Sequence, residues 1–256
     1  MYCKPLVCFG NAYDCKEAIK SFNELPCDKL RLDYIKYPLN FLEAQKFFLK
    51  HNEYTHFIYL APDLIVTKNQ FNELKKNVIN NDYDVYGPVC NVDKGKYIDK
   101  LACCLKLPEI PFHLRLYRFV DESHRLYFLE HNVKILKVKF NALAFCFIKR
   151  SILEKYSFST LPFKTDEKPI WERKTGYACD LAFAHYCNFS NIDIIVDLRI
   201  KAEHLRYPGP LQVGRKPPKI TFIRYEENKE HGIKELTESK IQSSGQILQG
   251  KENNSF

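Results

Sequence analysis

The chain has 256 residues, 45% hydrophobic and 27% charged, a composition typical of one globular domain rather than of a disordered chain. Its formal net charge of +8 favours anionic partners, but the basic residues are scattered and match no nucleic-acid-binding motif. The start lacks a charged stretch followed by an apolar one, and no apolar run could span a bilayer. We therefore expect a cytoplasmic protein with no transmembrane segment and no nucleic-acid partner.

The first 50 residues alternate between strand and helix patterns. An apolar run at residues 5–9 predicts a buried strand that stops at a Gly-Asn turn, and a helix follows because Asp14 and Glu17 have capping-box spacing. Residues 30–37 are strand-like, and a second helix is expected over residues 40–49. The order is therefore β, α, β, α.

The next segment has the most buried-looking strand of the chain, at residues 56–60. Thr67 and Gln70 have capping-box spacing and predict a helix, and a further strand is expected over residues 83–89. Alternating elements of these lengths predict an α/β fold with a mostly parallel central sheet and helices on both faces. Ligands in such sheets bind at the carboxyl ends of the strands.

The second half is less regular. We expect irregular structure over residues 93–135, where prolines and aromatic residues are frequent. Regular elements should return as a strand at 137–148, a short helix capped by Ser151, a helix at 179–186 and a strand at 192–197. Residues 226–256 are polar and predict a flexible tail after a domain of residues 1–225.

The ten cysteines include no C-x-x-C pair, so a zinc ribbon or a thioredoxin-like site is disfavoured. We expect most of them to be buried thiols, and whether any form disulfides stays open.

Two segments carry a resemblance to a known family. Residues 54–63 (YTHFIYLAPD) resemble the strand and DxD region of GT-A glycosyltransferases, a nucleotide-diphospho-sugar transferase superfamily, with a family 2-like arrangement. The motif is degenerate, because Ala61 stands where the first acid is expected and only Asp63 remains. The resemblance implies that Asp63, with Pro62 before it, contacts the donor diphosphate and holds Mn²⁺ or Mg²⁺. One carboxylate can suffice, since phosphate and water supply other ligands.

The second segment lies nearer the carboxyl end. A helix opening at Asp180, a strand ending in Asp197 and a following His204 occur in the order found in GT-A enzymes. The resemblance implies that Asp180 is the catalytic base and that His204 completes the metal site. Each residue also has a simpler interpretation: Asp63 in an Asx turn, Asp180 as a charge favoured at a helix N-terminus, and His204 as a surface histidine.

The same resemblance implies the remaining site residues. Donor binding would involve Phe9 and Asn11, at and just after the end of the first strand, and Asp33, after the first crossover. The acceptor and sugar pocket would be formed by Asn141, Ala142 and Trp171.

The resemblance thus implies a GT-A-like, metal-dependent glycosyltransferase that moves a sugar from a UDP- or GDP-sugar to a hydroxyl, with inversion slightly favoured. The acceptor, which could be a glycan, a protein or a lipid, stays unidentified, and peripheral membrane contact stays open. Two alternatives remain: a non-catalytic nucleotide- or sugar-binding protein on the same fold, and a nucleotidyltransferase. The second is less favoured because the turn after the first strand has one glycine and no nearby arginine.

Overall fold

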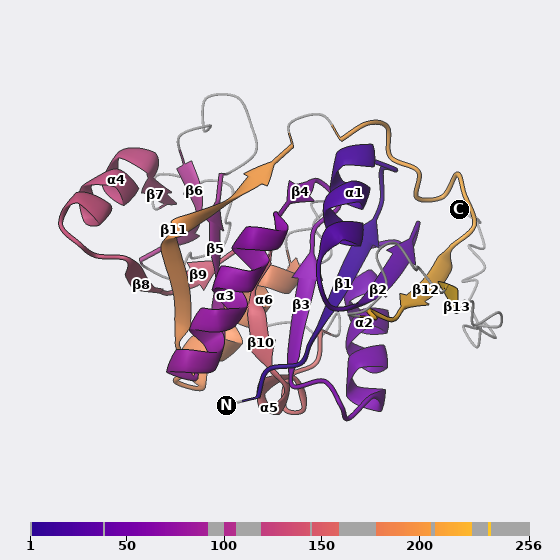
Figure 1. The fold of residues 1–256 in the computed structure, drawn as a ribbon, viewed down its shortest axis with the longest axis horizontal. Helices are drawn as coiled ribbons and strands as arrows, with labels where there is room; N and C mark the ends of the chain where they lie inside the picture. The colour runs from indigo at the N-terminus through magenta and orange to yellow at the C-terminus, as the bar shows by residue number, and fades with distance from the viewer. Residues whose placement is uncertain are drawn as a thin grey trace, which may run out of the picture.

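The structure is a computed structural model that describes residues 2–37, 39–91, 100–105, 119–143, 145–158, 178–205, 208–226 and 235–236. Figure 1 shows the arrangement of its helices and strands. The helices are α1 (Lys16–Glu24), α2 (Leu39–Lys50), α3 (Lys68–Asn81), α4 (Glu122–Glu130), α5 (Arg150–Leu153) and α6 (Ala178–Phe189). The strands are β1 (Pro5–Asn11), β2 (Asp28–Asp33), β3 (His56–Leu60), β4 (Leu64–Ile65), β5 (Val85–Cys90), β6 (Lys100–Cys104), β7 (Phe119–Asp121), β8 (Ile135–Val138), β9 (Phe140–Asn141), β10 (Phe147–Lys149), β11 (Ile194–His204), β12 (Lys219–Ile223) and β13 (Glu235–Leu236).

Ten of these strands form one sheet in the order β13-β12-β2-β1-β3-β10-β5-β11-β4, with β8 also paired to β11. A second, three-stranded sheet has the order β7-β6-β9. The expectation of a GT-A-like, mostly parallel central sheet is wrong. Among the described pairings of the large sheet, three are parallel, namely β1 with β2, β1 with β3 and β5 with β11, and the other six are antiparallel.

The difference arises from how the strands of the second half pair. β8, β9 and β10 follow one another with no intervening helix among the described residues, where we expected one long strand. β10 inserts antiparallel between β3 and β5, and β12 pairs antiparallel with β2. The paired strands are far apart in the chain, so no short turn between them sets their relative direction.

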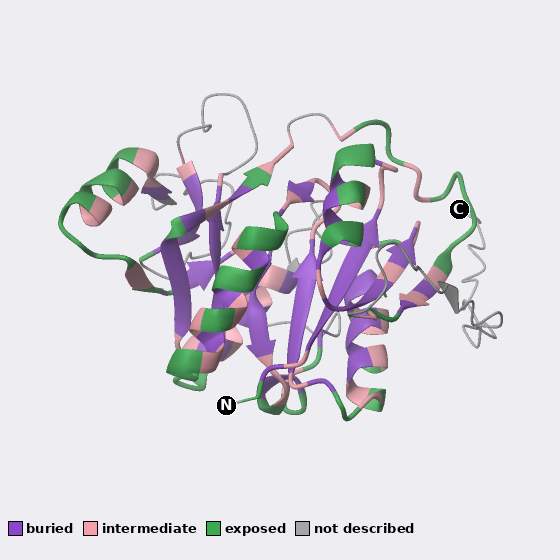
Figure 2. Ribbon diagram, viewed as in Figure 1, coloured by how far each residue is buried: buried purple, intermediate pink, exposed green. Residues whose placement is uncertain are grey.

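Alternate side chains of the central strands supply two apolar cores, one on each face of the sheet. On one face α1 and α3 contribute Phe22 and Phe71, which pack with Phe9 of β1. On the other face α2 and α6 contribute Phe48 and Phe183. In Figure 2 the central strands are buried, while the outward sides of α1, α2 and α3 are exposed. Burial on both faces explains why β1 and β3 are mostly apolar.

Local sequence signals account for several element boundaries. The capping box at Thr67 is confirmed: its side chain accepts from the Gln70 N–H, and the Gln70 side chain accepts from the Thr67 N–H. β3 has the predicted bounds. β11 continues past Asp197, where the sequence predicts its end, because a bulge between Asp197 and Lys201 lets the strand stay paired with β5.

Regular structure extends into two regions where we expected little. The stretch 93–135 contains β6, β7 and α4, and β13, within the expected tail, pairs antiparallel with β12. All ten cysteines are buried free thiols, so the structure contains no disulfide between them. In the described part of the chain no helix has both the length and the apolar character needed to cross a membrane.

Candidate functional site

The carboxyl ends of β1, β2 and β3 meet at one edge of the sheet because these strands are parallel and adjacent. Asn11 ends β1 and lies opposite Asp33, the last residue of β2. Asp63 follows β3 by three residues. Polar side chains from three strands therefore gather at this edge, which we call the strand-end site, defined by Asn11, Asp33 and Asp63.

Asn11 and Asp33 form a direct pair. The Asn11 Nδ2 donates to Asp33 Oδ1 at 2.5 Å, and the Arg31 Nε donates to the same oxygen at 2.7 Å. Both members of the pair are buried, with exposed fractions of 1% for Asn11 and 5% for Asp33. Burial of a carboxylate is tolerated here because charged and polar donors satisfy it.

A second carboxylate, Asp14, joins this network. Asp14 takes a left-handed backbone conformation with φ 57°, and its side chain accepts from Tyr34 Oη at 2.7 Å and Lys216 Nζ at 2.5 Å. Burial acts to raise the pKa of Asp14, but hydrogen bonds from Lys216, Tyr34 and Asn11 together lower it below its ordinary value. The predicted capping box is therefore absent, and Cys15 is the N-cap of α1 instead.

The segment 208–216 returns to the strand ends from the far end of the chain. The Gln212 N–H donates to the Ala12 carbonyl at 2.8 Å, and Lys216 reaches Asp14. Neither Lys216 nor Tyr34 was among the residues predicted for the site. The signal for Tyr34 was weak, because a tyrosine with a positive φ is uncommon and no glycine or asparagine marks the turn.

Asp63 and His204 are 141 positions apart in the sequence, and the β4–β11 ladder brings them together. His204 lies opposite Leu64 in that ladder, and the Leu205 N–H donates to the Asp63 carbonyl at 2.7 Å. The His204 Nε2 is 3.2 Å from Asp63 Oδ2, with side chains 19% and 21% exposed. The pair is thus partly open to solvent, which a ligand would need.

The other ring nitrogen of His204 is held by the backbone. His204 Nδ1 lies 3.1 Å from the Asn91 carbonyl oxygen, which can only accept a hydrogen bond. If Nδ1 carries a proton and donates it to Asn91, two states of Nε2 are possible. In the charged imidazolium Nε2 presents an N–H to the Asp63 carboxylate, and in the neutral ring it presents a lone pair. A lone pair against a carboxylate is unfavourable unless a cation lies between them. The geometry is therefore that of an ion pair or of two neighbouring metal ligands.

The chemistry of the pair fits a divalent ion. Metal-binding histidines commonly donate their second ring nitrogen to a carbonyl or carboxylate, as His204 Nδ1 can to Asn91. Ligands at right angles around an ion with bonds of about 2.1 Å lie ~3 Å apart, close to the separation of Asp63 and His204. Among the described residues no group of three or more His, Cys, Asp or Glu could hold a metal. Further ligands would have to come from a substrate or water.

Tyr59, the next-to-last residue of β3, is buried close to the end of that strand. Its Oη accepts from Asn40 Nδ2 at 2.7 Å, and its ring stacks on Phe41 with centroids 3.7 Å apart. A Cβ added at Gly10 would lie 1.9 Å from Tyr59 Oη, so this position of β1 requires glycine. Burial and, to a lesser extent, Cys8, Cys179 and Asp63 raise the pKa of Tyr59 well above its ordinary value.

Asp180 lies in the first turn of α6, on the same face of the sheet as Tyr59 and α2. The Leu181 N–H donates to Asp180 Oδ1 at 2.8 Å, and the Cys179 N–H donates to Tyr37 Oη at 3.1 Å. Burial raises the pKa of Asp180 to about 6, against the opposing effect of backbone hydrogen bonds. Tyr37 is affected in turn: burial first, and then the Asp180 charge, raise its pKa.

The remaining predicted residues lie as follows. The Phe9 side chain is in the core, stacked on Phe22, so only its backbone could reach a donor. Pro62 is partly exposed next to Asp63. Asn141 is buried and donates to the Pro88 carbonyl and to Cys146 Sγ, both at 3.3 Å. Ala142 is half-buried beside it, and Trp171 lies outside the described residues.

Comparisons with known proteins give little further information. No family model matches the chain, and no curated protein matches it. Among solved structures, the crystal structure of A197 from STIV aligns with 88% of this chain and 86% of its own length, with a TM-score of 0.44 and 13% sequence identity. A similarity this low assigns neither a fold nor a function to the chain.

Proposed function

We propose that the protein is a metal-dependent glycosyltransferase that moves a sugar from a nucleotide-diphosphate donor, a UDP- or GDP-sugar, to an acceptor hydroxyl. The donor would lie at the strand-end site, and Asp63 with His204 would hold Mn²⁺ or Mg²⁺. Asp180 would accept the proton of the acceptor hydroxyl. The function rests on these three residues rather than on the sheet topology.

The observation that carries the proposal is the contact between Asp63 and His204. These two candidate metal ligands are 3.2 Å apart just past the end of β3. The divalent ion, when bound, supplies positive charge that stabilises the departing diphosphate. The chain itself contributes one carboxylate and one imidazole, which leaves positions for phosphate oxygens.

The environment of Asp180 supports its role as a base. A carboxyl group with a pKa of about 6 is mostly ionised at neutral pH and still binds protons more readily than an exposed aspartate. Asp180 and Asp63 are the two acids on which the proposal depends. Besides burial, the Asp63 charge raises the pKa of Tyr59 and the Asp180 charge raises the pKa of Tyr37.

The test is a donor panel. UDP- and GDP-sugars are incubated with the protein and Mn²⁺, and release of the nucleoside diphosphate is measured. We expect turnover that falls about 100-fold or more in Asp63→Ala and in His204→Gln, since ligand loss removes charge stabilisation. Glu203→Gln is the matched control, because Glu203 is exposed and adjacent to His204 on β11. Absence of binding and of turnover with every donor would overturn the proposal.

A second candidate is a non-catalytic protein that binds the nucleotide or its sugar. Ala61 occupies the position of an acid in the motif, and the described residues contain no three-ligand metal group. Saturable donor binding with no diphosphate release in any variant would favour this candidate over the transferase.

A further inference from the structure

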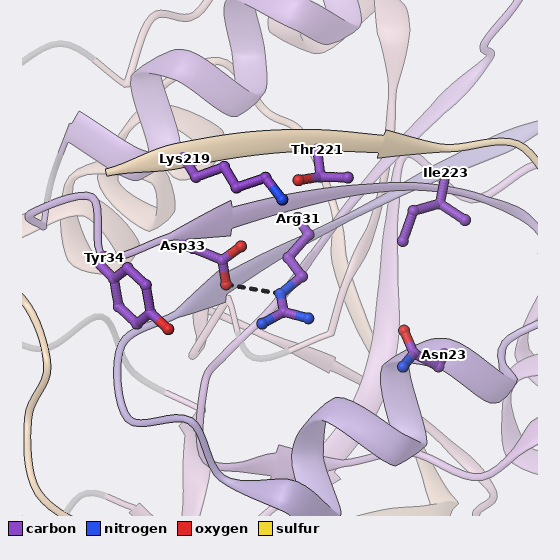
Figure 3. Close-up of a pocket in the computed structure, with 7 residues that line it drawn as sticks. All are labelled: Asn23, Arg31, Asp33, Tyr34, Lys219, Thr221 and Ile223. Atoms are coloured by element: carbon purple, nitrogen blue, oxygen red, sulfur yellow. Dashed lines mark hydrogen bonds and ion pairs between the residues drawn. The ribbon is translucent and has the colours of Figure 1, made fainter. Parts of the chain in front are cut away.

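A cavity of about 250 Å³ lies on the α1 side of the sheet, over β2 and β12. Its lining residues are Asn23, Arg31, Asp33, Tyr34, Lys219, Thr221 and Ile223 (Figure 3). It shares only Asp33 with the residues proposed to bind the donor. The cavity therefore extends away from the strand ends rather than repeating the site described above.

Strand register explains why these side chains face one space. Asp33 pairs with Lys219, Arg31 with Thr221 and Lys29 with Ile223 between the antiparallel strands β2 and β12. Alternate residues of a strand point to the same face, so the side chains of these pairs line one side of the sheet. Asn23 approaches from the last turn of α1, and Figure 3 shows Arg31 pointing from β2 into the space toward it.

The charge in the cavity is mainly positive. Arg31 uses its Nε to bind Asp33 at 2.7 Å, but within the described ranges its two terminal nitrogens have no hydrogen-bond partner. Lys219 is exposed at the rim and likewise has no ion-pair partner there. The one carboxylate, Asp33, is already engaged by Asn11 and Arg31. Donors are thus left over, and an anion would use them.

A third cation, Lys29, contacts the backbone of Asn23, one of the lining residues. Lys29 is 5% exposed, and its Nζ donates to the carbonyl of Asn23 at 2.9 Å and to that of Leu25 at 3.0 Å. Lys29 pairs with Ile223, a lining residue of the cavity, between the antiparallel strands β2 and β12. The carbonyls that hold the Lys29 ammonium carry no net charge. The ammonium therefore contributes positive potential, which favours negative charge in the adjacent space.

We propose that this cavity is a second binding site, which takes the phosphoryl group of a small phosphomonoester. Arg31 provides a forked pair of donors, Lys219 a mobile ammonium and Thr221 a hydroxyl, a set suited to the several oxygens of a tetrahedral dianion. Ile223 and the Tyr34 ring leave an apolar wall for the organic part of the ligand. The proposal does not depend on the glycosyltransferase function.

The experiment is a titration followed by NMR on ¹⁵N-labelled protein without metal. The probes are inorganic phosphate and glucose 6-phosphate, with glucose as the uncharged control. We expect saturable shifts of the Arg31 Nε–H and of the Asn23 and Thr221 amides with both phosphate probes, and none with glucose. Tighter binding of glucose 6-phosphate would identify a phosphomonoester, and equal binding would identify free phosphate.

Variants test the assignment of the site. Arg31→Gln and Lys219→Gln should each weaken phosphate binding about tenfold, the usual effect of losing one charged hydrogen bond. Lys219 is exposed, so its variant should fold even if Arg31→Gln does not. Lys76→Gln, on an exposed part of α3, and Asp63→Ala should bind phosphate like the unchanged protein. Shifts spread evenly over surface lysines, or equal binding by Lys219→Gln and Lys76→Gln, would overturn the proposal.

Discussion

Two carboxylates, one within β11 and one close to it, differ in how many hydrogen bonds they accept from the protein. Asp197 is completely buried and accepts from Tyr86 Oη at 2.6 Å, Asn77 Nδ2 at 3.2 Å and three nitrogens of Arg199, at 2.6 Å, 2.9 Å and 3.0 Å. Asp63 is 21% exposed, and its side chain makes one ion-pair contact, with His204. Each was predicted to lie at or just after the end of a buried strand, and only Asp63 was predicted to bind a ligand.

The difference teaches how a structural acid can be told from a candidate ligand. The Asp197 oxygens accept hydrogen bonds from α3, β5 and β11, and these bonds fix the bulge of β11. Asp197 is therefore not available to bind a ligand. Asp63 is partly exposed, and among the described residues its side chain has no partner besides His204, so lone pairs remain for a ligand. If this contrast is correct, loss of Asp197 lowers the stability of the protein, whereas loss of Asp63 weakens ligand binding.

The largest effect is expected for Asp197→Ala. Removing a buried carboxylate leaves Tyr86 and Arg199 without their partner, which should lower the free energy of unfolding by about 3–5 kcal/mol. Denaturant unfolding measures the change. Asp193→Ala is the control: Asp193 is 49% exposed and pairs only with Lys137, so its loss should cost under about 1 kcal/mol. Equal losses in the two variants would contradict the structural role of Asp197.

Asp180 extends the comparison to a half-buried carboxylate that accepts few hydrogen bonds from the described residues. Its pKa is raised to about 6, above the value of about 3.9 in an unfolded chain. Between pH about 3.9 and about 6, the folded chain therefore holds a proton on Asp180 that the unfolded chain releases. The stability contributed by the protonated group is lost as pH rises through 6. Asp180→Asn should be more stable than the unchanged protein by about 1–3 kcal/mol at pH 7.5.

The pH dependence of that difference is the check. Below pH ~3.5 both proteins carry a neutral side chain at residue 180, and their thermal unfolding should coincide. Activity should behave in the opposite way, because the proposed base must be ionised: turnover should rise as pH increases through about 6 and should be lost in Asp180→Asn. A pH-independent stability difference would contradict the raised pKa.

A smaller effect is expected for Tyr86→Phe. The hydroxyl of Tyr86 donates to Asp197 at 2.6 Å, so its removal takes one of several donors from a buried charge. The free energy of unfolding should fall by about 1–2 kcal/mol. Tyr83→Phe, whose ring stacks on Tyr86 with centroids 4.9 Å apart, provides a control of the same chemistry in the same cluster. Unchanged stability of Tyr86→Phe would mean that Asp197 does not need this donor.

The smallest effect on stability is expected for Asp63→Ala without metal. The pair with His204 is partly exposed, so its loss should change the free energy of unfolding by about 1 kcal/mol or less. Thermal unfolding in the presence of a chelator measures this. A loss as large as that of Asp197→Ala would make Asp63 a structural acid, and the contrast between the two carboxylates would fail.

Local structure was more predictable than long-range pairing. The Thr67 capping box and the apolar run of β3 are signals contained within a few residues, and they predicted α3 and β3 correctly. Strand direction depends on partners far along the chain: the insertion of β10 between β3 and β5 has no local signal. For this reason the mostly parallel sheet was wrongly predicted.

The candidate site shows the same division. The residue types of Asp63, Asp180 and His204 were identified from order and spacing, but the sequence could not show that the β4–β11 ladder places His204 against Asp63. The sequence also gave no indication that Tyr34 and Lys216 would donate hydrogen bonds to Asp14. Lys216 lies about 200 positions further along the chain than Asp14.

The most direct test of the central claim is the affinity of Mn²⁺ in the presence of UDP, measured by electron paramagnetic resonance of the free ion. The unchanged protein, Asp63→Asn, His204→Gln and the control Glu203→Gln are compared. We expect one ion per chain, with the affinity reduced about tenfold or more in Asp63→Asn and His204→Gln and unchanged in Glu203→Gln. Equal Mn²⁺ affinity in all four proteins would contradict the assignment of Asp63 and His204 as metal ligands.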